Sequence, residues 1–158
     1  MNYKILFPFL AFFFLQCRSQ KINDVNFKYG KLFYQDSTII ESHLYNSVTG
    51  LYEYKKKNFG FGEDESVTAT IKLTEKELND IYNLYVSLKP KHLTECIFND
   101  NKLFYKSYVI FNSEKNKLSP ECTTGKQEEN NKIKIKILKL IKSSPAYKTA
   151  FYWEFIRK

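Results

Sequence analysis

Several residue types are scarce in this chain of 158 residues, and each scarcity excludes a class of protein. Glycine and proline number five and four, too few for collagen or for a Gly/Pro-rich low-complexity chain. The two histidines form no HExxH pattern, so the sequence gives little support to metal-dependent hydrolysis. No GxSxG elbow is present, and no internal repeat indicates a solenoid or a propeller.

Arginine is scarce too, because Arg18 and Arg157 are the only two in a chain whose Lys and Arg total 25 and whose formal net charge is +8. Bidentate recognition of phosphates and base edges favours arginine over lysine. Lysines spread along the whole chain are typical of a solvated surface. We therefore expect no nucleic-acid partner. The alternative, nucleic-acid binding, predicts one continuous lysine face.

Aromatic side chains are abundant, with 12 Tyr and 14 Phe, whereas disordered chains are poor in them. A chain of this length suits one globular domain, which buries roughly 68–70% of its unfolded surface. The composition therefore predicts a single folded domain with an aromatic core.

Residues 5–15 form an uncharged apolar run, ILFPFLAFFFL, directly behind Lys4. A secretory h-region is about 7–15 residues long, whereas a membrane-spanning helix needs about 20. The run therefore predicts an export signal over residues 1–16. The alternative is a buried N-terminal strand, since Pro8 disfavours a core helix.

The segment FLQC at residues 14–17 ends this run, and it resembles the signal peptide of a bacterial lipoprotein, although two of its positions depart from the usual residues. The resemblance extends no further than the leader. It implies that Cys17 becomes the first mature residue and carries the lipid, which attaches the protein to a membrane. Residues 17–26 are then the lipidated cysteine and a polar tether to a domain over 27–158. The alternative, cleavage after Ser19, would release a soluble secreted protein.

Cys96 and Cys122 remain as an even pair if Cys17 is lipidated, and an exported protein meets an oxidising compartment. We predict a disulfide between them, which would close a loop of about 27 residues and contribute about 3–4 kcal/mol. Three alternatives stay open: two separate buried thiols, a zinc site that adds His92, and a Cys–His nucleophile pair. We expect no cofactor and no metal.

Alternating or aromatic segments predict the strands. They cover residues 27–34, 39–45, 51–56, 67–73 and 103–111. A turn that ends at Gly50 joins the second segment to the third and indicates a hairpin. Both faces of the last segment are apolar or aromatic, so we expect this strand near the centre of the sheet.

Thr74 and Glu77 have the spacing of a capping box, which predicts a helix over about 74–88. Pro90 closes this helix. The spacing of these signals makes this helix the clearest element in the sequence.

Residues 128–143 contain the alternating run KIKIKI, but a longer window gives isoleucines and leucines at helical spacing with most lysines opposite. This pattern predicts C-terminal helical packing. Ser144 and Pro145 fit the start of a last short helix, whereas residues 151–156 are alternatively a closing strand. The predicted fold is α+β, one small domain with a mainly antiparallel sheet.

Few side chains group into catalytic or metal-binding patterns. His43 lies in a predicted strand and His92 in a loop, where a sheet-face or surface role is the simpler interpretation. Gly60–Gly62 lacks the third glycine of a dinucleotide fingerprint. The three carboxylates of Glu63–Glu65 predict a solvated loop, with Ca²⁺ binding as the alternative. The aromatic C-terminus around Trp153 is either core packing or an exposed recognition patch.

We therefore expect a lipid-anchored domain facing the periplasm or the cell surface, without catalytic residues. It would bind a protein or envelope partner as an inhibitor, an immunity-type protein or an assembly accessory. The alternative is a small envelope hydrolase whose acids converge only in the fold. The candidate acids are Glu63, Asp64, Glu65 and Glu154. A deep cleft with convergent polar groups would favour the hydrolase, and an aromatic exposed patch the binding module.

Overall fold

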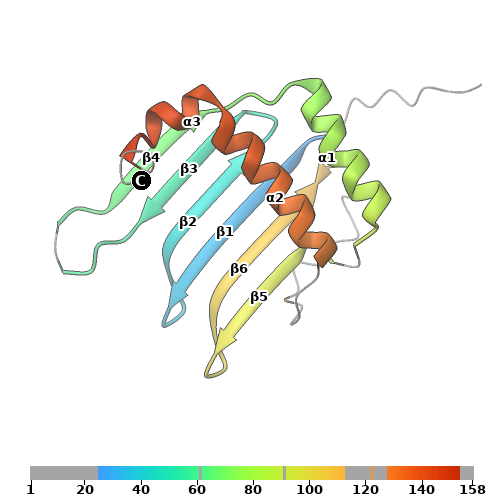
Figure 1. Cartoon of the computed structure of the whole chain (residues 1–158). Coiled ribbons are helices and arrows are strands. Elements are labelled where there is room, and N and C mark those ends of the chain that lie inside the picture. Colours follow the sequence, from blue (N-terminus) through green and yellow to red (C-terminus); the bar gives the residue numbers. More distant parts are fainter. Residues whose placement is uncertain (1–24, 61, 91, 113–121, 123–127, 154–158) are drawn as a thin grey trace, which may run out of the picture.

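The computed structural model describes residues 25–60, 62–90, 92–112, 122 and 128–153. Figure 1 shows the chain with its elements labelled. In chain order they are β1 (Phe27–Gln35), β2 (Thr38–Asn46), β3 (Leu51–Lys56), β4 (Glu65–Thr70), α1 (Glu75–Leu88), β5 (Thr94–Asn99), β6 (Lys102–Phe111), α2 (Glu128–Ser143) and α3 (Pro145–Ala150). The predicted α+β class is confirmed.

The described strands form an antiparallel sheet in the order β4-β3-β2-β1-β6-β5. Strands β1 to β4 follow one another as a meander, and β6 pairs with the other side of β1 after the chain has passed through α1 and β5. Strand β6 therefore lies inside the sheet, as its two apolar faces predicted. Strand β5 at the edge was not among the predicted strands.

The strand predicted over 67–73 is β4, which starts earlier, at Glu65, and ends at Thr70, where Ile71 turns to other partners. The backbone N–H of Ile71 donates to the carbonyl of Gly50 over 2.6 Å, and the carbonyl of Ile71 accepts the hydroxyl of Tyr45 over 2.9 Å. These bonds replace the ladder with β3. Gly50 has φ +72°, and a Cβ there would lie 2.9 Å from the Ile71 carbonyl oxygen, so the turn requires glycine.

Helix α1 begins at the predicted capping box. The Thr74 hydroxyl accepts the backbone N–H of Glu77 over 3.3 Å, and the Glu77 carboxylate accepts the backbone N–H of Thr74 over 2.8 Å. Ile81 in this helix is fully buried against the sheet. The prediction of a helix over about 74–88 is confirmed.

The two C-terminal helices also follow the sequence pattern. Helix α2 buries Ile133, Ile137 and Ile141 on one face. The hydroxyl of Ser144 accepts the backbone N–H of Tyr147 over 3.1 Å and so begins α3. The alternative closing strand over 151–156 is not formed by residues 151–153, and the other three lie outside the described residues.

The three helices in the described part of the chain cover the same face of the sheet, as Figure 1 shows. The core lies between them and this face, and its large side chains are mostly aromatic. The fully buried ones include Phe27, Tyr29, Tyr45, Tyr52, Phe111, Tyr147 and Phe151. None of the helices in the described part of the chain has the length and apolarity needed to cross a membrane.

Candidate functional site

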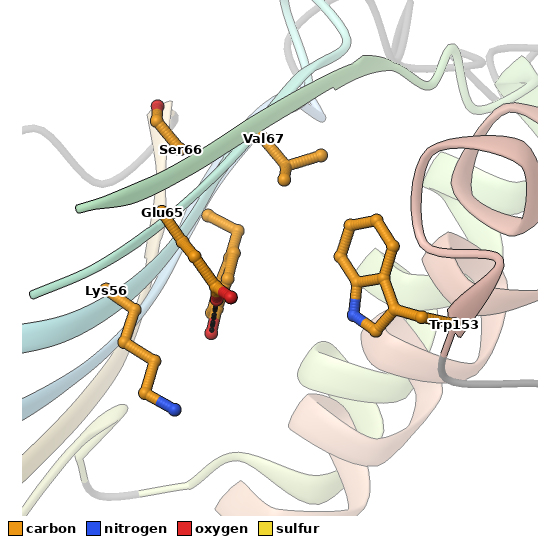
Figure 2. Close-up of a pocket in the computed structure, with 6 residues that line it drawn as sticks. Lys56, Glu65, Ser66, Val67 and Trp153 are labelled. Atoms are coloured by element: carbon orange, nitrogen blue, oxygen red, sulfur yellow. Dashed lines mark hydrogen bonds between the residues drawn. The ribbon is translucent and has the colours of Figure 1, made fainter. Parts of the chain in front are cut away.

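A groove lies where β3 and β4 face the last described residues of the chain. Its volume is about 470 Å³, within the range of about 300–1,000 Å³ that is common for small-molecule sites. Figure 2 shows the side chains of Glu65 and Val67 facing the indole of Trp153 across an open space. The lining residues are Tyr54, Lys56, Glu65, Ser66, Val67 and Trp153. We call this feature the Trp153 groove.

The register between β3 and β4 brings the polar and apolar walls of the groove together. Tyr54 is paired with Val67, and Lys56 with Glu65. Because side chains two residues apart along a strand point to the same face, these four side chains share one face of the sheet. Tyr52 precedes Tyr54 on that face and packs against α3, so the groove continues directly from the core.

Trp153 is held at the groove by the aromatic core. Its ring lies 5.3 Å from that of Phe151, which is 1% exposed. Phe151 in turn stacks on Tyr147 at 4.4 Å and meets the rings of Tyr52 and Tyr54 edge-on. The indole wall is therefore fixed from behind, which reduces the conformational entropy that a ligand would lose on binding.

The groove carries charges of both signs. The hydroxyl of Tyr54 donates to Glu65 Oε2 over 3.4 Å, a long hydrogen bond that leaves the carboxylate available to other donors. Among the described residues no carboxylate lies within ion-pair distance of the Lys56 ammonium. The groove thus presents a negatively charged acceptor, the Glu65 carboxylate, and a positively charged donor, the Lys56 ammonium.

His43 lies behind the groove and supports it. Its ring is 5.0 Å from that of Tyr54. Nε2 of His43 is 2.8 Å from Glu41 Oε1, and Nδ1 is 2.9 Å from the hydroxyl of Tyr52. Burial lowers the pKa of His43, although Glu41 opposes this shift. The neutral ring therefore donates from Nε2 and accepts at Nδ1, and neither nitrogen is left to bind a metal.

Cys96 and Cys122 are paired as a disulfide in the structure, with their Cα atoms 5.2 Å apart. This agrees with the pairing predicted from the sequence. His92 is exposed between α1 and β5, and no group of three or more His, Cys, Asp or Glu side chains in the described part of the chain could hold a metal ion. Cys17, the predicted lipid attachment site, lies outside the described residues.

The acidic segment Glu63–Glu65 shapes a loop, and its carboxylates belong to no metal-binding group among the described residues. The backbone N–H of Asn58 donates to Asp64 Oδ1 over 3.1 Å, and the Asn58 side chain donates to the carbonyl of Glu63 over 2.8 Å. Of these neighbouring acids, Glu65 lines the Trp153 groove. Glu154 lies outside the described residues. Two of the acids proposed for a hydrolase, Asp64 and Glu65, line a second pocket of about 330 Å³, and Glu63 is not among its lining residues.

A cluster that the sequence did not predict lies under α2. The Lys134 ammonium donates to Glu95 Oε2 over 3.1 Å and to the hydroxyl of Ser107. Serine beside lysine is a nucleophile and base pair in some hydrolases. Here Ser107 is fully buried and Lys134 is 5% exposed, so no substrate reaches the hydroxyl. The cluster joins α2 to β5 and β6.

The sequence pointed to Trp153 as either core or recognition patch, but it did not indicate what lies opposite. The groove combines residues 54–67 with a residue close to the C-terminus, and only the fold makes them neighbours. The one available signal was the strand predicted over residues 51–56, which contains Tyr54. No protein-family model, curated protein or solved structure matches this chain.

Proposed function

We propose that this protein is a lipid-anchored binding module of the cell envelope, facing the periplasm or the cell surface, and that the Trp153 groove holds its ligand. The apolar leader and Cys17 support export and anchoring. The Cys96–Cys122 pairing suits an oxidising compartment. Its role would be that of an inhibitor, an immunity-type protein or an assembly accessory.

One observation carries the binding role: a fixed indole stands across an open groove from Val67 and Glu65. A general acid and a general base require two positioned groups, as in the carboxylate pairs of glycosidases. Glu65 is the only carboxylate that lines the groove among the described residues. This arrangement favours binding over hydrolysis, the alternative that the sequence left open.

Cross-linking in intact cells tests anchoring and binding together. Cells producing the wild type, Cys17→Ala or Trp153→Ala are treated with a short cross-linker and separated into membrane and soluble fractions. We expect the wild type in the membrane fraction with cross-linked envelope material, because the acyl chains hold it there. Cys17→Ala should move to the soluble fraction, and Trp153→Ala should stay in the membrane but lose its cross-links.

The matched control is Ile135→Ala, which removes a side chain that is 63% exposed on α2, far from the groove. It should keep both the membrane location and the cross-links. Unchanged partitioning of Cys17→Ala would refute lipidation at that residue. Cross-links that survive in Trp153→Ala would refute the groove as the binding site.

A further inference from the structure

The chemistry of the Trp153 groove specifies a class of ligand. We infer that the groove binds a neutral saccharide, an inference that rests on the proposed function, in which this groove is the binding site. Three features of the groove support this ligand: the aromatic wall, the balance of charge and the rigidity of the aromatic lining side chains.

The indole of Trp153 offers a flat apolar surface beside polar groups. A pyranose ring has the same division, because its C–H groups form apolar patches while its hydroxyls project around the rim. Such a ring can pack on the indole and keep its hydroxyls at the side of the groove where Glu65 and Lys56 lie (Figure 2). Aromatic rings supply large contact areas with few rotatable bonds, so this contact costs little conformational entropy.

The charges in the groove favour a ligand without net charge. Because Glu65 and Lys56 carry opposite charges, the groove as a whole has no net preference for an anionic or a cationic ligand. A hydroxyl group both donates and accepts, so a saccharide can donate to the Glu65 carboxylate and accept from Lys56 at the same time. Hydrogen bonds to charged groups are stronger than those between neutral groups. They therefore offset the free energy that a hydroxyl loses when it gives up its hydrogen bonds to water.

The walls of the groove are preorganised. The ring of Tyr54 is held by His43 at 5.0 Å and by Phe151 at 5.9 Å, and its hydroxyl touches the Glu65 carboxylate. Each aromatic wall thus rests on a buried or half-buried aromatic neighbour. A ligand that depends on shape and hydroxyl geometry benefits from such fixed groups, because little ordering remains to be done on binding.

A glycan array read with the full-length protein tests the inference. The protein is kept in a detergent without a sugar headgroup, and the array carries neutral, anionic and cationic oligosaccharides. Trp153 is the only tryptophan of the chain, so its fluorescence reports directly on the groove. We expect neutral glycans to bind the wild type and to change this fluorescence saturably. Binding should fall about tenfold or more in Trp153→Ala and severalfold in Glu65→Gln, and it should be unchanged in Ile135→Ala.

Three results would overturn the inference: no glycan bound, only charged glycans bound, or equal binding by Trp153→Ala with an intact circular dichroism spectrum. The cross-linking experiment separates this failure from failure of the proposed function. An empty array combined with cross-links that depend on Trp153 would exclude saccharides and retain the binding module. An empty array without such cross-links would reject both.

Discussion

At the scale of the residue, Lys134 shows how a charge is accommodated in the core. Burial lowers the pKa of Lys134, and the bonds to Glu95 partly oppose this shift. The ammonium also donates to the carbonyl of Ser107, over 3.4 Å. Removing charges from water costs several kcal/mol, and the pair compensates this cost only while both members are present. The helical pattern placed most lysines of α2 opposite the isoleucines. Lys134 is an exception because it is buried, where Glu95 on β5 supplies its counter-charge.

Removing one member of this pair should therefore be costly. We expect Glu95→Gln to lower the free energy of unfolding by about 3 kcal/mol, because the buried ammonium loses its counter-charge. Urea unfolding followed by circular dichroism measures the difference. The double variant Glu95→Leu/Lys134→Met should recover most of the loss, since it leaves no unpaired charge.

The control for Glu95→Gln lies on α2, the helix that also carries Lys134. Glu128 pairs with Lys132 over 3.0 Å, and both side chains are largely exposed. Glu128→Gln should change the free energy of unfolding by less than about 0.5 kcal/mol. Equal effects of the two substitutions would mean that burial of the Lys134 pair has no energetic consequence.

At the scale of the element, local signals predicted α1 and α3 well because a side chain at the start of each helix caps its backbone. Thr74 and Ser144 accept N–H groups three residues ahead, and both patterns can be recognised without knowing the fold. Strand β5 was missed because its sequence, TECIFN, has no clear alternation. Its pairing with β6 is set by distant residues, which a local pattern does not contain.

The cap of α1 can be tested directly. Thr74→Ala removes the oxygen that accepts the Glu77 N–H, so we expect a loss of about 1 kcal/mol and a fall of about 4 °C in Tm. Thr74→Ser keeps that oxygen and should stay close to the wild type. An unchanged Tm in Thr74→Ala would show that the hydroxyl contributes nothing to the helix.

At the scale of the whole molecule, the class and most of the strands could be predicted, but the groove could not. Periodicity assigns a residue to one face of an element, whereas the groove depends on how α3 lies over β3 and β4. Phe151 fixes that position by packing against Tyr52 and Tyr147. Each of these residues is recognisable from the sequence as aromatic, but the sequence does not indicate which side chains it packs against. The pairing of Cys96 with Cys122 followed from the expectation that Cys17 carries a lipid, because only two cysteines then remain.

The oxidation state of that pair is open to measurement. Thiols are titrated in denaturant without reductant, using Cys17→Ala so that only Cys96 and Cys122 are counted. We expect no free thiol, and two after reduction, because the structure pairs the two cysteines. Reduction should also lower the free energy of unfolding by about 3–4 kcal/mol, since the cross-link restricts the unfolded chain. Two free thiols before reduction would contradict the pairing.

The strand order has a consequence for a chain that emerges N-terminus first. Strand β1 lies in the interior of the sheet, and its second neighbour is β6, which pairs Phe27 with Phe111. The first four strands alone would leave that side of β1 open and the aromatic face bare, because α2 and α3 come last in the chain. An intermediate with an unpaired strand edge and an exposed apolar face is prone to aggregation. Completion of the domain must therefore wait until nearly the entire polypeptide is available to fold.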